Sequence, residues 1–121
     1  MAGSSMKEFR ELREAQNARI HGKGHLGIER FFALDARAYE AGALDGRTKE
    51  LLGLSCSLVL RCDDCVTYHV IRCVEEGATD DQMLEAMNVA LVVGGSIVVP
   101  HLRRAVAFLD EMNALDGPKA V

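Results

Sequence analysis

The chain has 121 residues and a formal net charge of −4, and 49% of its residues are hydrophobic although only 5% are aromatic. This length predicts one domain, and the mild acidity without a basic stripe argues against nucleic acid as a partner. The apolar residues are mostly Leu, Val and Ala, which favours helices over strands. They also exceed what one small monomer is expected to bury, so the composition indicates a homo-oligomer.

The chain opens with Met1–Ser5, which resembles a cloning remnant ahead of a natural start at Met6. The single expected domain therefore covers residues 6–121. A polar first helix follows and is expected to be a loosely held arm. A second helix is expected to stop near Gly42, and its apolar side chains are Ile28, Phe31, Phe32, Leu34 and Tyr39.

Asp45 is expected to cap a third helix, because its side chain can accept a hydrogen bond from a free N–H group at the helix start. Apolar residues cover most of the circumference of this helix, which predicts burial on several sides. They are Leu51, Leu52, Leu54, Leu58 and Val59. A fourth helix is expected to begin near Cys62 and to end at Gly77, a typical left-handed position after a helix.

Thr79-Asp80-Asp81-Gln82 has the capping-box pattern and is expected to open a fifth helix, which Gly94-Gly95 ends. Ser96 is expected to cap a sixth helix, with Pro100 in its first turn, where proline costs little. No segment alternates apolar and polar residues with a period of two. The sequence therefore predicts an all-α, single-domain bundle of about six helices.

Cellular location is inferred from what the sequence lacks. No cationic stretch is followed by an apolar core and a cleavage site, so no secretory signal is recognised. The apolar run Leu84–Leu102 contains a glycine pair and Pro100, and it is read as two buried helices meeting at a turn and not as a membrane span. Four cysteines without a signal peptide favour the reducing cytoplasm, where a Cys-x-x-Cys is more often catalytic or metal-binding than structural.

The stretch Cys62-Asp63-Asp64-Cys65, with His69 four residues later, carries the chemistry. On a helix these two thiols and the imidazole share a face, because residues three and four apart are neighbours. A helix start favours a thiolate, although the two aspartates oppose it and Arg61 can offset them. We expect Cys62 to lie nearer solvent and Cys65 to lie one turn further in, within reach of the His69 ring. This pattern fits either redox chemistry or a metal.

Glu50 lies on the expected third helix, twelve residues before Cys62. If the third and fourth helices are antiparallel, Glu50 lies near His69, where a carboxylate would orient the imidazole and raise its basicity. The resulting relay runs from Glu50 through His69 to Cys65. The alternative is that Glu50 is an exposed carboxylate favoured by the helix macrodipole.

Glu50, Cys62-x-x-Cys65 and His69 at these spacings resemble the signature of the alkylhydroperoxidase D-like branch of the carboxymuconolactone decarboxylase family. The resemblance covers Leu44 to about Gly95. It implies an all-helical fold, a trimer or hexamer, and no tightly bound cofactor. It also implies a hydroperoxide substrate and reduction by a lipoyl-type dithiol or a thiol-redox partner protein.

The resemblance assigns a role to each motif residue. Cys65 would be the peroxidatic thiol that becomes a sulfenic acid, Cys62 the proton donor and resolving thiol, His69 the base and Glu50 the relay carboxylate. One departure is that Asp63-Asp64 occupy the gap in which redox members can carry a histidine. An acidic pair disfavours thiolates.

Two other readings remain open. Cys62, Cys65 and His69, with His101 or Glu50, could bind a structural zinc ion. A non-redox enzyme resembling the lactone decarboxylases would use histidines for proton transfer. Among the remaining candidates, Cys56 and Cys73 are expected to be small core residues. His101 is expected to be a hydrogen-bonded histidine in the core or at an interface. His21 and His25 are expected on the surface, and Tyr68 is expected to pack against its neighbours.

Overall fold

The computed structural model describes the backbone of residues 4–116 and the side chains of residues 6–115. Six α-helices and one 3₁₀ turn make up this part of the chain, with no β-strand in it. They are α1 (Ser4–Gly22), α2 (Leu26–Ala38), α3 (Gly46–Leu60), α4 (Asp63–Glu75), α5 (Asp80–Gly94), the turn Ser96–Val98 and α6 (Val99–Asp116). The all-α expectation is thereby confirmed. None of the described helices is long and apolar enough to cross a membrane.

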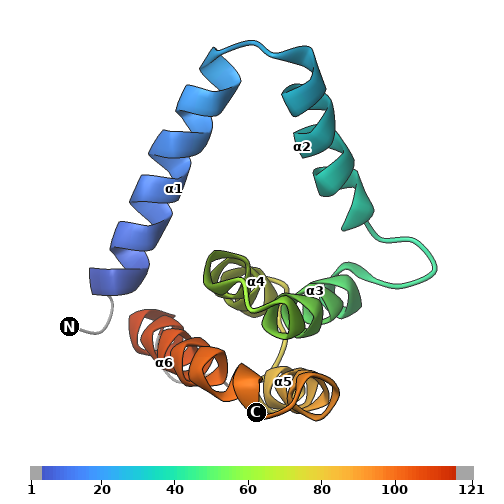
Figure 1. Ribbon diagram of the computed structural model, residues 1–121, viewed down its shortest axis with the longest axis vertical. Coiled ribbons are helices and arrows are strands. Elements are labelled where there is room, and N and C mark those ends of the chain that lie inside the picture. Colours follow the sequence, from blue (N-terminus) through green and yellow to red (C-terminus); the bar gives the residue numbers. More distant parts are fainter. Residues whose placement is uncertain (1–3, 117–121) are drawn as a thin grey trace.

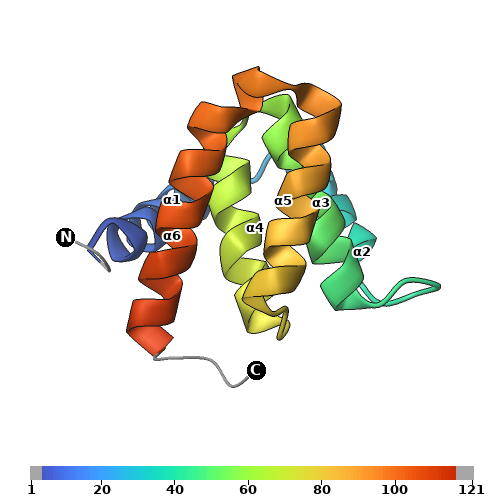
Figure 2. The ribbon, with the colours of Figure 1, turned by 90° about the horizontal axis from the view of Figure 1, so that it is seen from below.

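Helices α3 to α6 form an antiparallel bundle that contains most of the core (Figures 1 and 2). α3 packs against α4 and α5, and α4 packs against α6. Fully buried side chains from each helix fill the centre, and among them are Leu54, Leu58, Val70, Met83 and Ala105. This packing fixes α3 beside α4, the two helices that carry the residues predicted to be functional.

Helices α1 and α2 form an inverted V that stands away from the bundle (Figure 1). The beginning of α1 is anchored, because Met6 is fully buried and belongs to the core. α2 has no buried residue at all, and Phe31 and Leu34 are each 66% exposed. α2 ends at Ala38, earlier than the expected stop near Gly42. The proposal of a cloning remnant stays a prediction: Ser4 and Ser5 begin α1, and residues 1–3 lie outside the described part.

Local signals placed most helix ends correctly. Asp45 caps α3 by accepting a hydrogen bond from the backbone N–H of Thr48 at 2.7 Å. Thr79 opens α5 with both hydrogen bonds of a capping box, and Gly77 adopts φ +83° after α4. The expectation for Ser96 is wrong: it begins a 3₁₀ turn without a capping hydrogen bond from its side chain, and α6 starts at Val99.

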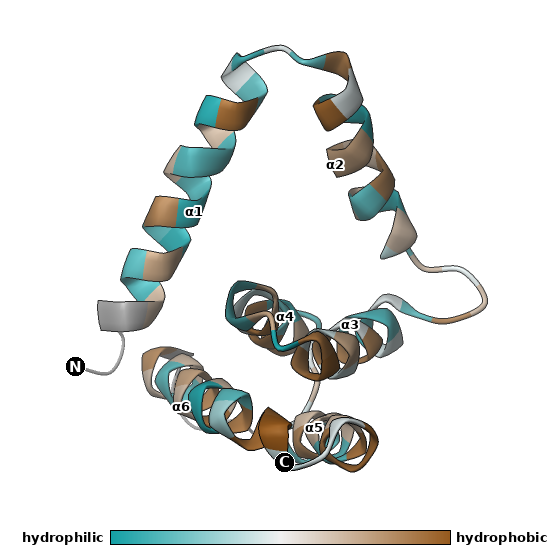
Figure 3. Cartoon of the chain, viewed as in Figure 1, coloured by the Kyte–Doolittle hydropathy of each residue, from teal (hydrophilic) through white to brown (hydrophobic). Residues whose placement is uncertain are grey.

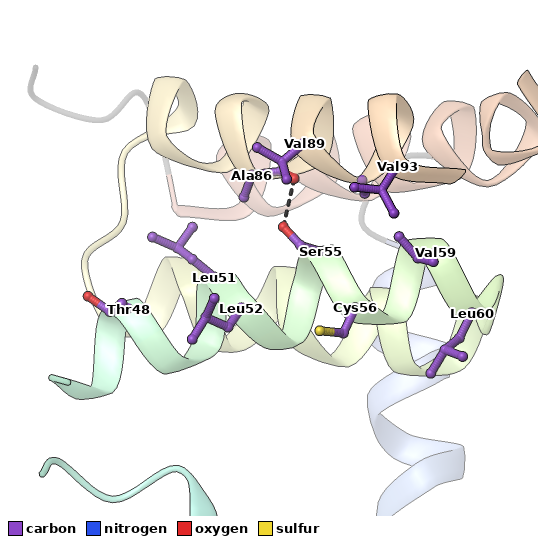
Figure 4. A pocket seen from close by; sticks show the side chains of 11 residues that line it. Thr48, Leu51, Leu52, Ser55, Cys56, Val59, Leu60, Ala86, Val89 and Val93 are labelled. Carbon is purple, nitrogen blue, oxygen red and sulfur yellow. Dashed lines mark hydrogen bonds between the residues drawn. The ribbon is translucent and has the colours of Figure 1, made fainter. Parts of the chain in front are cut away.

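The outer faces of α3 and α5 are more exposed than the sequence predicted. Leu52 on α3 is 50% exposed, and Val92 and Val93 on α5 are 77% and 69% exposed, so neither helix is buried on all sides within one chain. Hydrophobic segments are visible on α2 and α5 in Figure 3. Between α3 and α5 lies an apolar groove of about 670 Å³, here called the α3/α5 groove (Figure 4). Its walls include Leu52, Cys56, Val89 and Val93.

Candidate active site

A buried carboxylate and a buried imidazole meet where α3 crosses α4. Oε1 of Glu50 lies 2.8 Å from Nδ1 of His69, and the two residues are only 3% and 7% exposed. The other oxygen of Glu50 lies 3.5 Å from Nε of Arg72. The alternative of an exposed helix-start carboxylate is therefore wrong. A buried carboxylate needs such partners, since a buried charge is costly unless it is paired and hydrogen-bonded.

Gly53 makes room for this pair. It follows Glu50 by one turn of α3, and a Cβ atom at its position would lie 2.6 to 2.9 Å from three ring atoms of His69. Any larger residue would push the imidazole away from its present position. The glycine thus permits α3 and α4 to approach closely enough for Glu50 to reach Nδ1.

Tyr39, the C-cap residue that follows α2, approaches the other nitrogen of the same ring. Its hydroxyl lies 3.3 Å from Nε2 of His69, and the two rings have their centroids 5.2 Å apart. Burial, followed by the negative charges of Asp35 and Glu50, raises the pKa of Tyr39 above its usual value. This contact was not predicted from the sequence, because Tyr39 is thirty residues from His69 and no local motif relates them.

The two thiols lie at the start of α4. Cys62 is the N-cap residue, and its Sγ accepts a hydrogen bond from the backbone N–H of Cys65 at 3.3 Å. Both are free thiols. The predicted order of exposure is wrong, since Cys65 is exposed and Cys62 is half-buried. Cys65 points outward from the first turn of α4, and among the described contacts none joins its sulfur to His69.

The surroundings of Cys65 favour the protonated thiol. Its pKa is raised to about 11, first by partial burial of the sulfur and then by the hydrogen bond and charge of Cys62, with Asp64 and Asp35 adding further negative charge. The helix start, which alone would favour a thiolate, is outweighed. A pKa of about 11 means that Cys65 is a protonated thiol at neutral pH.

The two aspartates between the cysteines, Asp63 and Asp64, differ in their contacts. Asp63 is bound by α6, because its Oδ1 lies 2.7 Å from Nδ1 of His101 and its Oδ2 accepts a hydrogen bond from Arg104 at 3.2 Å. His101 is thus a half-buried, hydrogen-bonded histidine, as predicted. Asp64 has no such contact among the described hydrogen bonds and ion pairs. Of the two aspartates in the motif, Asp64 is therefore the one whose charge raises the pKa of Cys65.

The other candidates divide between core and surface. Cys73 is fully buried as predicted, and burial raises its pKa to about 12. Cys56 is exposed in the α3/α5 groove, so the core prediction is wrong for it. Tyr68 packs, as expected, with its ring 5.2 Å from that of His69 and with Arg13 over its face. The histidines of the first bend, His21 and His25, are exposed.

A metal site receives no support from the side-chain geometry. Within residues 6–115, no group of three or more His, Cys, Asp or Glu side chains is placed to hold a metal ion. Of the proposed ligands, His69 is buried against Glu50 and Tyr39, whereas Cys65 is exposed.

Fold and site together define a small all-helical protein in which a buried Glu–His pair lies beside a helix that starts with Cys-x-x-Cys. The chain belongs to the carboxymuconolactone decarboxylase family, whose family model matches residues 28–109. The matched part includes all four predicted site residues.

Solved structures agree with this assignment. Two crystal structures of a Thermotoga maritima protein match with TM-scores of 0.88 and 0.86 at 55% and 54% identity. They cover 91% and 90% of this chain and 96% and 92% of theirs. The second is described as a member of this family for which a part in the antioxidative response has been suggested. An apo family member from Legionella pneumophila has a TM-score of 0.78 at 25% identity, covering 93% of this chain and 98% of its own.

One sequence relative adds to the comparison. The uncharacterized protein 4 of the Paracoccus denitrificans cox locus is 37% identical over 83 residues, which are 69% of this chain and 75% of that protein.

Proposed function

We propose that this protein is an alkylhydroperoxidase D-like thiol peroxidase and disulfide reductase that acts in the cytoplasm. The observation that carries the proposal is the buried Glu50–His69 pair, at 2.8 Å, inside the helix pair that presents Cys62 and Cys65. A carboxylate on Nδ1 leaves the lone pair of the imidazole on Nε2, where it can accept a proton. The suggested antioxidative role of the Thermotoga relative supports the same chemistry.

The reaction begins when His69 takes the proton of Cys65. The thiolate attacks the terminal oxygen of a hydroperoxide, the O–O bond breaks, and the alkoxide leaves as an alcohol after it gains a proton from Cys62. Cys65 is then a sulfenic acid. Sγ of Cys62 attacks it, a disulfide forms, and the hydroxyl group leaves as water with the proton held by His69. A lipoyl-type dithiol or a thiol-redox partner protein reduces the disulfide and is itself oxidised.

Cys65→Ser tests this assignment against Cys56→Ser, a matched control at an exposed thiol outside the Cys-x-x-Cys motif. We expect hydroperoxide consumption with dihydrolipoamide as reductant to be lost in Cys65→Ser and retained in Cys56→Ser. Cys62→Ser should still form one sulfenic acid, which a dimedone adduct at Cys65 would report by mass spectrometry. Unaltered turnover in Cys65→Ser would falsify the proposal.

A second candidate is proton-transfer chemistry of the lactone decarboxylase type, without the cysteines. The raised pKa of Cys65 and the contact of His69 with Tyr39 instead of a thiol favour it. Turnover of a carboxylated lactone that persists in Cys62→Ser/Cys65→Ser and disappears in His69→Gln would establish this alternative. Failure of the wild-type protein to act on such lactones would remove it.

We also propose that the protein functions as a trimer or hexamer. The exposed apolar residues of α2 and of the α3/α5 groove support this, because contiguous apolar patches on a soluble protein mark interaction sites. Light scattering, which measures the molecular mass of the assembly in solution, tests this on the wild-type protein and on Val93→Glu. We expect the mass of Val93→Glu to be lower than that of the wild type, and a monomeric wild-type protein would contradict the proposal.

A further inference from the structure

Tyr39 lies at the one nitrogen of His69 that a proton relay to Cys65 would use. Glu50 accepts the hydrogen of Nδ1 at 2.8 Å, so the lone pair of the ring is on Nε2. The hydroxyl of Tyr39 lies 3.3 Å from that atom. Because an unprotonated ring nitrogen can only accept, we assign the hydroxyl as the donor of this contact. Since its pKa is raised, the phenol keeps its proton and remains a donor at neutral pH.

We propose that Tyr39 is a positioning residue that withholds His69 from Cys65 in the resting site and releases it when a substrate arrives. This inference rests on the role of His69 as base in the proposed function. A hydrogen bond donated to the lone pair of a neutral imidazole stabilises the neutral form and therefore weakens the base. When the Tyr39 hydroxyl leaves, the S–H bond of Cys65 can break, its proton passes to Nε2, and a thiolate and an imidazolium paired with Glu50 result.

The helix that precedes Tyr39 is suited to such a movement. α2 has no buried residue, and Tyr39 is its C-cap residue, at the junction with the loop to α3. A cavity of about 700 Å³ lies between α2 and the bundle, and Tyr39, Phe32 and Glu50 line it. A molecule that enters this cavity contacts Tyr39 directly and can displace its hydroxyl from His69.

The charged groups around this contact come from four helices and from the residues that follow two of them. Asp35 lies on α2 and Glu40 just after it, Glu50 on α3, Arg72 on α4 and Glu76 just after it, and Arg13 on α1; all six line the same cavity. Four carboxylates and two guanidinium groups make this lining net negative. The hydroxyl of Tyr39, which is uncharged, is thus the group whose removal changes the hydrogen bonding of Nε2 without adding or removing a charge.

Tyr39→Phe tests the proposal, with Tyr68→Phe as the matched control. Tyr68 also lies against the ring of His69, but no described hydrogen bond joins its hydroxyl to that ring. The readout is the rate of iodoacetamide alkylation at Cys65 at neutral pH, measured by peptide mass spectrometry. We expect Tyr39→Phe to react about fivefold faster, the effect of losing one hydrogen bond between uncharged groups, and Tyr68→Phe to react like the wild type. A slower or unchanged rate in Tyr39→Phe overturns the proposal.

A second pair of measurements separates this role from a structural one. In a His69→Gln background, Tyr39→Phe should no longer change the alkylation rate, and a persisting effect would show that Tyr39 does not act through His69. Nitrogen NMR of the imidazole should show the Nε2 resonance of His69 moving, in Tyr39→Phe but not in Tyr68→Phe, towards the position of a nitrogen that accepts no hydrogen bond. An unmoved resonance in Tyr39→Phe also overturns the proposal. Neither measurement consumes hydroperoxide. If peroxidase activity is absent while these results hold, the proposed function fails and the role of Tyr39 at His69 stands.

Discussion

Substituting Gly53 by alanine perturbs the site through one added methyl group. That methyl would lie 2.6 Å from Cε1, 2.8 Å from Nε2 and 2.9 Å from Nδ1 of His69. The imidazole cannot easily yield, because Glu50 and Tyr39 hold its two nitrogens and the residue is only 7% exposed. Either the ring leaves its hydrogen bonds or α3 moves away from α4.

Two opposing terms set the magnitude. Overpacking a well-packed core costs about 1–3 kcal/mol, and three simultaneous close contacts with a restrained ring place Gly53→Ala near the upper end. Alanine in place of glycine inside a helix returns about 1 kcal/mol. We therefore expect the free energy of unfolding to fall by about 2 kcal/mol.

Urea unfolding followed by circular dichroism, at one fixed protein concentration, measures this loss. Gly22→Ala is the matched control, since nothing lies within 4 Å of a Cβ atom there, and it should be neutral or slightly stabilising. In a His69→Ala background the ring is gone, so Gly53→Ala should stabilise by up to about 1 kcal/mol. Equal destabilisation with and without the His69 ring would refute the reasoning, because the cost would then not come from the imidazole.

Three further predictions concern the charges of the site. Alkylation of Cys65 in the folded protein should keep accelerating from pH 9 to about pH 11, because the raised pKa means that the thiolate forms only there; a plateau near pH 9, as expected for urea-unfolded protein, would contradict this. Because the pKa of Cys65 is higher in the folded than in the unfolded protein, this thiol also contributes to the free energy of unfolding. The contribution is fully present below pH 9 and is lost as the pH rises through about 11. Asp64→Asn should speed Cys65 alkylation about twofold at pH 8 and low salt, the scale of an exposed charge interaction. Asp63→Asn is its control and should have a smaller effect, because His101 and Arg104 already offset that charge; equal effects would contradict the distinction. Glu50→Gln should lower hydroperoxide turnover about 100-fold with the helical content intact, as for loss of general-base assistance, and unchanged turnover would remove Glu50 from the relay.

Local chemistry made much of the fold readable from the sequence. Asp45, Thr79 and Gly77 act on backbone groups within a few residues of themselves, so their effect on helix ends does not depend on the rest of the molecule. The approach of Glu50 to His69 was also predictable, because two antiparallel helices joined by a short turn leave little choice of register. The roles of these residues and of the thiols remain predictions.

What the sequence determined by itself is the set of helices, their caps and the chemical groups gathered at the start of α4. Only the tertiary structure decided which of those groups meet. Tyr39 reaches His69 from α2, His101 and Arg104 reach Asp63 from α6, and Cys65 faces outward while Cys62 is half-covered. These contacts join residues that are thirty or more positions apart, and the angles at which whole helices pack determine them. No local periodicity or spacing encodes those angles, because they result from the packing of the entire core.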